Sequence, residues 1–232
     1  MFPLLDLLRR GALHRTRVEA FSDGVFAIVV TLLILEVRVP HLEHGTVAEL
    51  KHGLHEVVPK VLSWAISFIV VCKFWINHSY IFSLARHSSY ALMWINALFL
   101  MAQAFIPFPT ALLGEYPYNP LAVSFFGVVL LVNTLLFVWM HYYINAYLLH
   151  AHMHRVSRRT LLSRSMVGPA CYALGAGLAW VSVWAAFAVY LLTPLFFIVP
   201  LQPDHGLAVA EGLLEEPSTT PKPYPGHSSV SV

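Results

Sequence analysis

A cluster of polar and ionisable residues opens the first long apolar run of the sequence. Arg17, Ser22 and Asp23 stand at its start, and Thr31 lies further along. An ionisable group at the centre of a membrane span costs roughly 2.5–3.5 kcal/mol and normally faces protein or water. Asp23 therefore either complements the positive end of a helix dipole or faces protein or water inside the membrane.

A stripe of large apolar side chains shares this segment with the polar cluster. At about 100° per residue, one narrow face of a helix collects Phe21, Ile28, Leu32 and Leu35, with Thr31 at its edge. A stripe of this kind either packs against another helix or lines a pore. Periodicity alone leaves both interpretations open.

Composition indicates that these residues belong to a membrane protein. Of the 232 residues, 58% are hydrophobic and 11% are charged, whereas soluble proteins carry about 25% charged residues. The mean hydropathy is +0.67. The apolar runs are about 18 to 27 residues long, and a helix needs about 20 to cross the hydrocarbon layer. Because backbone groups in lipid must pair within their own segment, we expect an all-α, polytopic membrane protein with six transmembrane helices.

The predicted spans are four of ordinary length and a final pair of short ones. They cover about residues 18–39, 57–84, 90–113 and 121–149, and the block 166–200 divides near 175–180. Pro107 and Pro109 stand near the far end of the third span, where a helix kinks or stops. A polar stretch with several histidines, residues 41–56, connects the first two spans.

Flanking charges predict the orientation of the chain. With the N-terminus inside, the inner segments hold ten lysine and arginine residues and the outer segments hold three. The positive-inside rule then puts both termini in the cytoplasm. We expect a multi-pass protein of the cell (plasma) membrane, in contact with the lipid bilayer. The net charge of +2 gives no sign of a nucleic-acid partner.

Three regions follow from this organisation. Residues 1–16 are expected to form a cytoplasmic N-terminal segment, and residues 17–200 a six-helix transmembrane domain. Residues 201–232 are polar and rich in proline, so we expect a disordered cytoplasmic tail.

The first span carries a motif that resembles the signature of a known family. The motif is Arg17-x-x-x-Phe21-Ser22-Asp23, followed by Ala27-Ile28 and Thr31-Leu32-Leu33. It is similar to that of the transmembrane protein 175 family of potassium channels, and the chain resembles the prokaryotic members with a single six-helix repeat. Further similarities, over about residues 15–200, are Trp75-x-x-His78, Asn96, Gln103 and the segment 107–110.

The resemblance implies a homotetramer in which the first helix of each subunit lines a central pore. The matching constriction residues are Ile28, Leu32 and Leu35, with Ile28 as the innermost ring, and Thr31 matches a polar pore-helix threonine. Large aliphatic side chains replace the carbonyl-lined filter of ordinary potassium channels. The implied function is a channel for monovalent cations with modest selectivity for potassium over sodium.

The resemblance also implies a polar clamp near the cytoplasmic side. In it, Arg17 bonds with Trp75 and His78 of the second span. Ser22 and Asp23 are expected to cap the helix or to bridge between helices near the inner mouth. Taken alone, His78 fits equally well as an interior histidine that donates to a backbone carbonyl.

A secondary transporter, proton-coupled or not, is the alternative function. It requires carboxylates or histidines near the bilayer midplane and broken helices in two related halves, whereas the deep positions here are aliphatic. The spans offer no constellation for catalysis, so we expect no enzyme. His150, His152 and His154 occupy every second position, a spacing that resembles a metal site. They lie, however, in a basic loop without nearby carboxylates. We therefore expect no metal site and no cofactor, only the permeant potassium ion.

Two charged residues keep more than one interpretation. Lys73 in the second span extends to the interface, pairs with Asp23, or serves a purpose particular to this protein. Glu36, near the outer end of the first span, either joins an outer ring of charge or pairs with Arg38.

Overall fold

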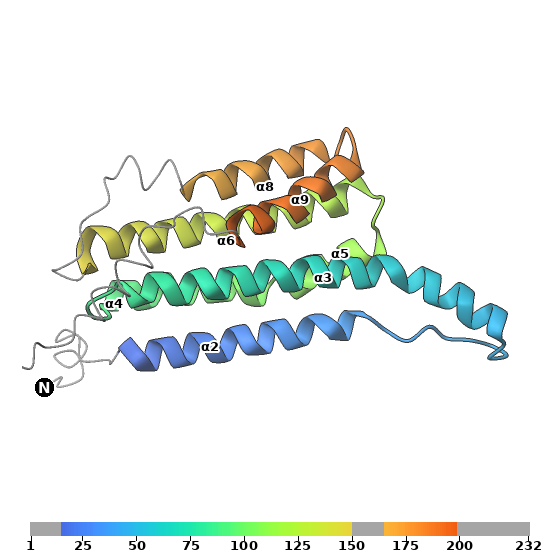
Figure 1. The fold of residues 1–232 in the computed structure, drawn as a ribbon, viewed down its shortest axis with the longest axis horizontal. Coiled ribbons are helices and arrows are strands. Elements are labelled where there is room, and N and C mark those ends of the chain that lie inside the picture. The colour runs from blue at the N-terminus through green and yellow to red at the C-terminus, as the bar shows by residue number, and fades with distance from the viewer. Residues whose placement is uncertain (1–14, 150–164, 199–232) are drawn as a thin grey trace, which may run out of the picture. The chain divides into compact units, whose positions relative to one another are not determined.

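A computed structural model of the chain describes residues 15–149 and 165–198, which belong to one compact unit ending at Ile198 (Figure 1). Apart from Arg15 and Thr16, the predicted N-terminal segment lies outside the described residues. The predicted tail 201–232 and the loop with its three alternating histidines lie outside them as well. Every regular element in the described ranges is a helix, and an isolated bridge joins Ala85 to Leu149.

Successive helices alternate in direction, except that α5 continues in the direction of α4 (Figure 1). Their bounds are Arg15–Leu32 for α2, Val47–Ser83 for α3, Tyr90–Ala104 for α4, Pro107–Glu115 for α5, Pro120–Tyr143 for α6, Val167–Leu178 for α8 and Val183–Ile198 for α9. A 3₁₀ turn, η1 (Leu33–Glu36), continues α2, and a π-helical turn, η2 (Ile144–Leu148), continues α6.

Length and composition make four of these helical segments candidates for crossing a membrane. They are Arg15–Glu36, Val47–Ser83, Tyr90–Glu115 and Pro120–Leu148, and two shorter apolar helices follow. This pattern confirms the all-α, polytopic class and the long-then-short order of the predicted spans. α8 ends at Leu178, inside the interval predicted for the division of the last block.

α3 is much longer than the second predicted span. The helix begins at Val47, ahead of the membrane span predicted from about residue 57. A capping box explains the early start: the Thr46 side chain accepts from the Glu49 amide, and Glu49 Oε2 accepts from the Thr46 amide. At 1.5 Å per residue, the 37 residues of α3 extend for about 55 Å, well beyond the roughly 30 Å of a bilayer core.

The third predicted span is broken into α4 and α5 at the expected prolines. Pro107 has no amide hydrogen, and the Ile106 amide bonds to the Gln103 carbonyl at 3.0 Å. The carbonyl of Ala102, left without that amide, accepts instead from Asn133 Nδ2 of α6 at 3.2 Å. A side chain from a neighbouring helix thus satisfies a backbone group freed by the break.

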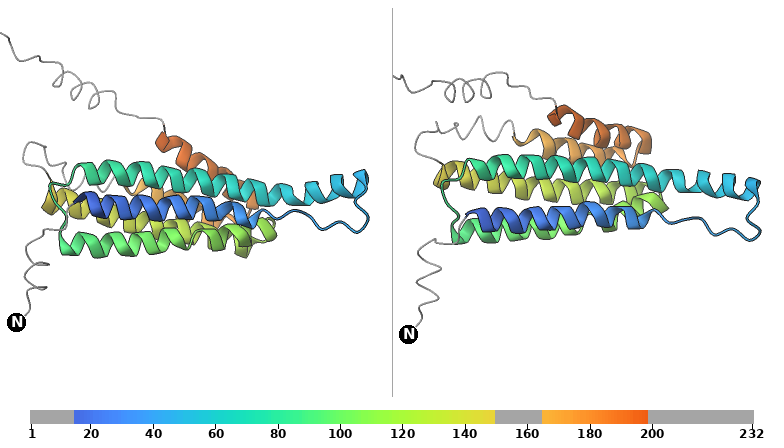
Figure 2. Two further views of the ribbon diagram at one scale, coloured as in Figure 1. Left: turned by 90° about the horizontal axis from the view of Figure 1, so that it is seen from below. Right: turned by 60° about the horizontal axis from the view of Figure 1, so that its bottom comes forward.

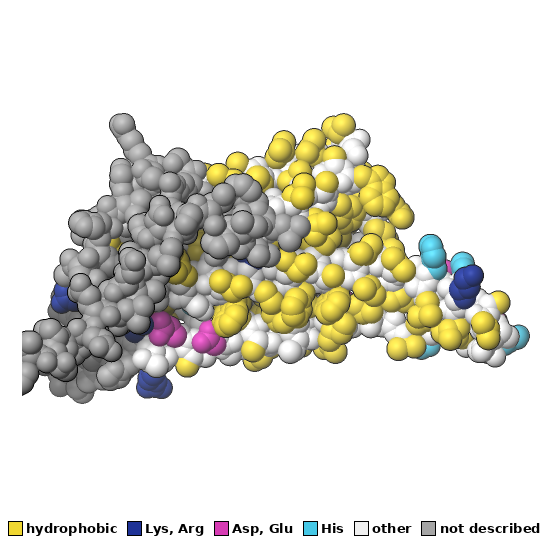
Figure 3. Space-filling view, in the orientation of Figure 1, with side chains coloured by type: hydrophobic (Ala, Val, Ile, Leu, Met, Phe, Trp, Pro, Cys, Tyr) yellow, Lys and Arg dark blue, Asp and Glu magenta, His cyan; other side chains and the backbone are white. Residues whose placement is uncertain are grey.

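α2 packs on α3 and α4, and α6 packs mainly on α8 (Figure 2). The outer surface is strongly apolar: Figure 3 shows hydrophobic side chains over the middle of the visible face, with charged and histidine side chains towards the two ends. Such a distribution suits a protein whose middle lies in hydrocarbon and whose ends meet water.

Candidate functional site

α2 has two distinct faces. One is buried against the rest of the subunit through Val18, Ser22, Phe26, Val29 and the Leu33 that follows the helix. The other carries the predicted stripe, which is exposed within the single chain: the exposed fractions are 64% for Phe21, 59% for Ile28, 44% for Leu32 and 64% for Leu35. The stripe therefore makes little contact within its own chain and is available to lipid, to a pore or to another subunit.

Thr31 lies on the exposed side of α2, next to this stripe. Its hydroxyl bonds to two carbonyls of the preceding turn, Ala27 O and Ile28 O, both at 2.9 Å. The hydroxyl hydrogen is thus used within the helix. The lone pairs of Oγ1 remain directed outward, where they can accept from water or approach a cation.

A chain of buried hydrogen bonds joins three helices beneath the stripe. His78 Nε2 of α3 donates to Asn96 Oδ1 of α4 at 2.8 Å. Asn96 Nδ2 donates to Ser22 Oγ of α2 at 2.9 Å, and that hydroxyl donates to the Val18 carbonyl at 2.8 Å. All three side chains are almost fully buried. Each bond lies in a medium of low dielectric constant, where an unmet polar group is costly.

Aromatic rings enclose the histidine of this chain. The His78 imidazole stacks on Phe82 with 4.4 Å between ring centroids and lies parallel to Phe99 at 5.9 Å. Phe26 of α2 meets it edge-on at 5.5 Å. The ring is therefore fixed in position by packing as well as by its hydrogen bond.

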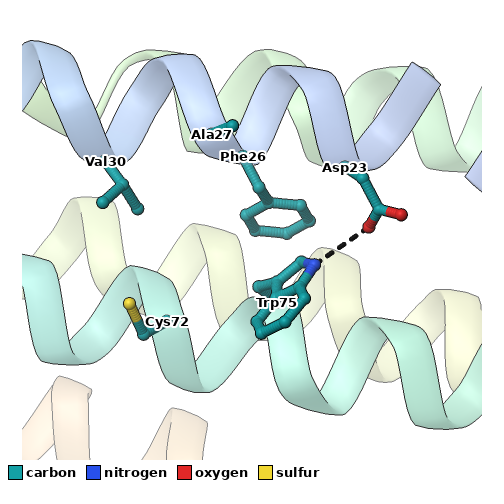
Figure 4. Close-up of a pocket in the computed structure, with 6 residues that line it drawn as sticks. All are labelled: Asp23, Phe26, Ala27, Val30, Cys72 and Trp75. Carbon is teal, nitrogen blue, oxygen red and sulfur yellow. Dashed lines mark hydrogen bonds between the residues drawn. The ribbon is translucent and has the colours of Figure 1, made fainter. Parts of the chain in front are cut away.

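Asp23 makes a separate link from α2 to α3. Trp75 Nε1 donates to Asp23 Oδ1 at 2.9 Å (Figure 4). Both residues lie at one end of an apolar groove of about 390 Å³ between the two helices. Ser22 and Asp23 thus join α2 to different neighbours, one to α4 and one to α3.

Arg17 is exposed, and none of its hydrogen bonds or ion pairs falls within the part of the chain that the structure describes. Trp75 and His78 bond to Asp23 and Asn96 there, so their pairing with Arg17 stays a prediction. Arg15 is the arginine that reaches α3: its Nη1 donates to the Ala85 carbonyl at 2.9 Å, just past the end of α3.

Charged residues also gather at the far end of α2. A cavity of about 320 Å³ is lined there by Glu36, Arg38, Lys60 and Glu115, among others. The ion pair in this group is Lys60 Nζ to Glu115 Oε2 at 2.6 Å, which joins α3 to α5. Lys73, by contrast, is buried and lies 4.9 Å from the centroid of the Phe74 ring.

Comparisons with known proteins fit this arrangement of helices. The family model described as endosomal/lysosomal potassium channel TMEM175 matches residues 17–107, which hold α2, α3, α4 and the polar chain between them. A protein of Chamaesiphon minutus named as a potassium channel is 35% identical over 186 residues, covering 78% of this chain and 92% of its own length. The chain belongs to the TMEM175 family.

Two further comparisons agree over most of the chain. A Streptomyces collinus protein named as a potassium channel is 35% identical over 187 residues, covering 78% of this chain and 90% of its own length. A crystal structure of a lysosomal potassium-selective channel TMEM175 homolog from Chamaesiphon minutus superposes with a TM-score of 0.69 at 32% identity. That match covers 79% of this chain and 96% of the other.

Sequence reasoning noted Asn96 as a TMEM175-like residue without giving it a role, and it missed Arg15. A signal for Asn96 was present, because a polar amide in the middle of an apolar span normally faces protein. No local signal pointed to Arg15, since its partner carbonyl lies 70 positions along the chain.

Proposed function

We propose that this chain is the subunit of a homotetrameric, potassium-conducting cation channel whose pore is lined by α2. The observation that carries the proposal is the division of α2 into a buried face and an exposed ridge of Phe21, Ile28, Leu32 and Leu35. Four copies that turn this ridge inward remove it from lipid and form rings of aliphatic side chains. The naming of the Chamaesiphon minutus and Streptomyces collinus relatives as potassium channels supports potassium as the permeant ion.

Such rings act through hydration. An aliphatic constriction offers no ligand to an ion, so a narrow ring excludes water and blocks conduction. When the ring is wider, a large and weakly hydrated cation loses part of its water at lower cost than a small one. Potassium is then preferred over sodium without a carbonyl filter, and the preference is modest. The outward lone pairs of Thr31 support a partly hydrated ion beside the Ile28 ring.

The proposed channel lies in the cell membrane with both termini cytoplasmic. The bias of basic residues supports this orientation. It puts Arg15, Arg17 and Asp23 near the cytoplasmic end of α2.

Ion flux in liposomes tests the proposal. Purified protein is reconstituted with a potassium gradient, and flux is followed with a potassium-sensitive dye while internal pH is monitored separately. A channel gives flux that follows the potassium gradient when the pH gradient is clamped at zero. Flux that stops without a proton gradient contradicts the proposal and favours the proton-coupled transporter.

The innermost ring is tested by Ile28→Asn. A polar amide stays hydrated and coordinates small cations as well as large ones, so we expect the potassium-to-sodium permeability ratio to fall towards unity in bilayer recordings. Val132→Asn is the matched control, because Val132 is a comparably exposed aliphatic residue on α6, away from α2. An unchanged reversal potential for Ile28→Asn removes this residue from the selectivity-determining ring.

A further inference from the structure

The Asp23 carboxylate lacks a basic partner within the described residues. Its Oδ1 accepts from Trp75 Nε1, and the ion pairs found in the described ranges use the carboxylates of Glu19, Glu56 and Glu115 instead. Asp23 lies about two turns into α2, inside a predicted membrane span. A carboxylate in such a setting is stabilised when a cation meets it.

The groove beside Asp23 has the shape and lining of a site for a short apolar chain. Its volume is about 390 Å³, and beyond Asp23 and Trp75 it is lined by Phe26, Ala27, Val30 and Cys72 (Figure 4). It opens on the surface of the subunit, where Asp23 and Ala27 are exposed and Trp75 is 43% exposed. From Asp23 to Val30 the helix rises about 10 Å at 1.5 Å per residue.

We propose that this groove binds a lipophilic amine from the membrane. The ammonium group meets the free oxygen of Asp23 and the indole face of Trp75, a combination of ion pair and cation–π contact. The apolar tail lies along the helices towards Val30 and Cys72. The charged end of the groove is the one nearer the start of α2. The bound amine therefore points its ammonium group towards the membrane surface and its tail towards the membrane interior, as a lipid of the same leaflet does.

Other occupants match only part of this groove. A potassium ion neutralises Asp23 but leaves the apolar length of the groove without contacts. An uncharged acyl chain fills that length but removes water from a carboxylate and gives it no counter-charge. A lipophilic cation satisfies both ends.

Cys72 on the groove wall serves as the reporter for a direct test. The Cys171→Ala protein, which keeps Cys72, is reconstituted as the full chain in liposomes. The rate at which Cys72 reacts with methyl methanethiosulfonate is measured by mass spectrometry. The two probes are N,N-dimethyloctylamine, a tertiary amine that is protonated at neutral pH, and N,N-dimethyloctanamide, a neutral molecule of the same skeleton. The reaction needs no ion flux, so its result is independent of the proposed channel function.

We expect the amine to protect Cys72 at about tenfold lower membrane concentration than the amide. Asp23→Glu keeps the charge and should retain this preference, whereas Asp23→Asn should abolish it. Trp75→Phe keeps an aromatic ring of weaker cation–π character and loses the indole N–H, so the preference should shrink. Because each protein is its own reference for amine against amide, differences in membrane partitioning cancel between variants.

Three outcomes overturn the proposal. Equal protection by amine and amide in the parent protein denies the role of charge. If Asp23→Asn protects Cys72 with the same preference for amine over amide as Asp23→Glu, another residue recognises the charge. A Cys72 that does not react even without either probe indicates that a neighbouring subunit covers the groove in the assembled protein. If Asp23→Asn fails to fold, the parent protein alone still decides the first and third outcomes, and Trp75→Phe tests the aromatic half of the site.

Discussion

Asn96 is the residue on which the buried polar chain depends, because it both accepts from His78 and donates to Ser22. Removing its amide leaves the His78 ring N–H without a partner and takes one donor from Ser22, which keeps its bond to the Val18 carbonyl. An unmet buried polar group costs about 1–3 kcal/mol. We therefore expect Asn96→Leu to lower the thermal stability of the purified protein markedly. Fluorescence-detected unfolding in detergent measures the change.

The control for this prediction is Ser83→Ala. In the part of the chain that the structure describes, the exposed Ser83 hydroxyl bonds to the Tyr80 carbonyl of its own helix, so we expect little effect on unfolding. A stability of Asn96→Leu equal to that of the parent protein would show that water or local rearrangement replaces the amide at no cost.

Tyr190 of α9 helps to hold the hairpin of α8 and α9 to α6. The Tyr190 ring lies where α6 and α8 approach each other at Gly127 and Gly175, and its hydroxyl donates to the Val123 carbonyl at 3.0 Å. A Cβ on Gly175 would overlap ring atoms of Tyr190, which is fully buried. We expect Gly175→Ala to destabilise the protein by about 1–3 kcal/mol, the usual cost of overpacking a core.

Gly177→Ala on the same helix is the matched control for that prediction. In the described ranges, a Cβ added at Gly177 meets no neighbouring side chain or helix within 4 Å, and alanine is the better helix former. Its unfolding temperature should equal or exceed that of the parent. The same rise for Gly175→Ala, measured in the same unfolding assay, would mean that Tyr190 moves aside freely.

The helices were easier to predict from the sequence than the contacts between them. Hydropathy alone gave the order of the helices, and Pro107 and Pro109 gave the break in the third span, because both signals are local. The early start of α3 had a local signal as well, the Thr46–Glu49 capping box, but the polar composition of residues 41–56 outweighed it. The bond from Trp75 to Asp23 had none, since the register between two helices depends on the packing of many residues at once.

At the scale of the whole molecule, we expect Gly24 to contribute to the assembly of subunits. Glycine inside a helix costs about 0.8–1.0 kcal/mol relative to alanine, yet a Cβ added at Gly24 meets no neighbouring side chain or helix within 4 Å among the described residues. Small residues in membrane helices let neighbouring helices approach closely. In the proposed tetramer we expect Gly24→Leu to shift the protein towards smaller species, measured by size exclusion with light scattering.

Gly177→Leu separates assembly from folding in this experiment, because Gly177 is equally open but lies on α8. It should assemble like the parent, and both variants should keep the parent helicity by circular dichroism. Full assembly of Gly24→Leu would indicate that this glycine faces lipid or open pore rather than a neighbouring helix.

The attachment of α2 at both ends limits how the proposed pore changes width. Near its start, Ser22 and Asp23 bond to α4 and α3, and at its far end Leu33 is fully buried while η1 packs on α3 and α5. A rod anchored in this way has high torsional stiffness: it resists spinning about its long axis. A larger aperture then comes from displacement of entire subunits away from the symmetry axis, so agents that alter opening need not touch the ridge at all.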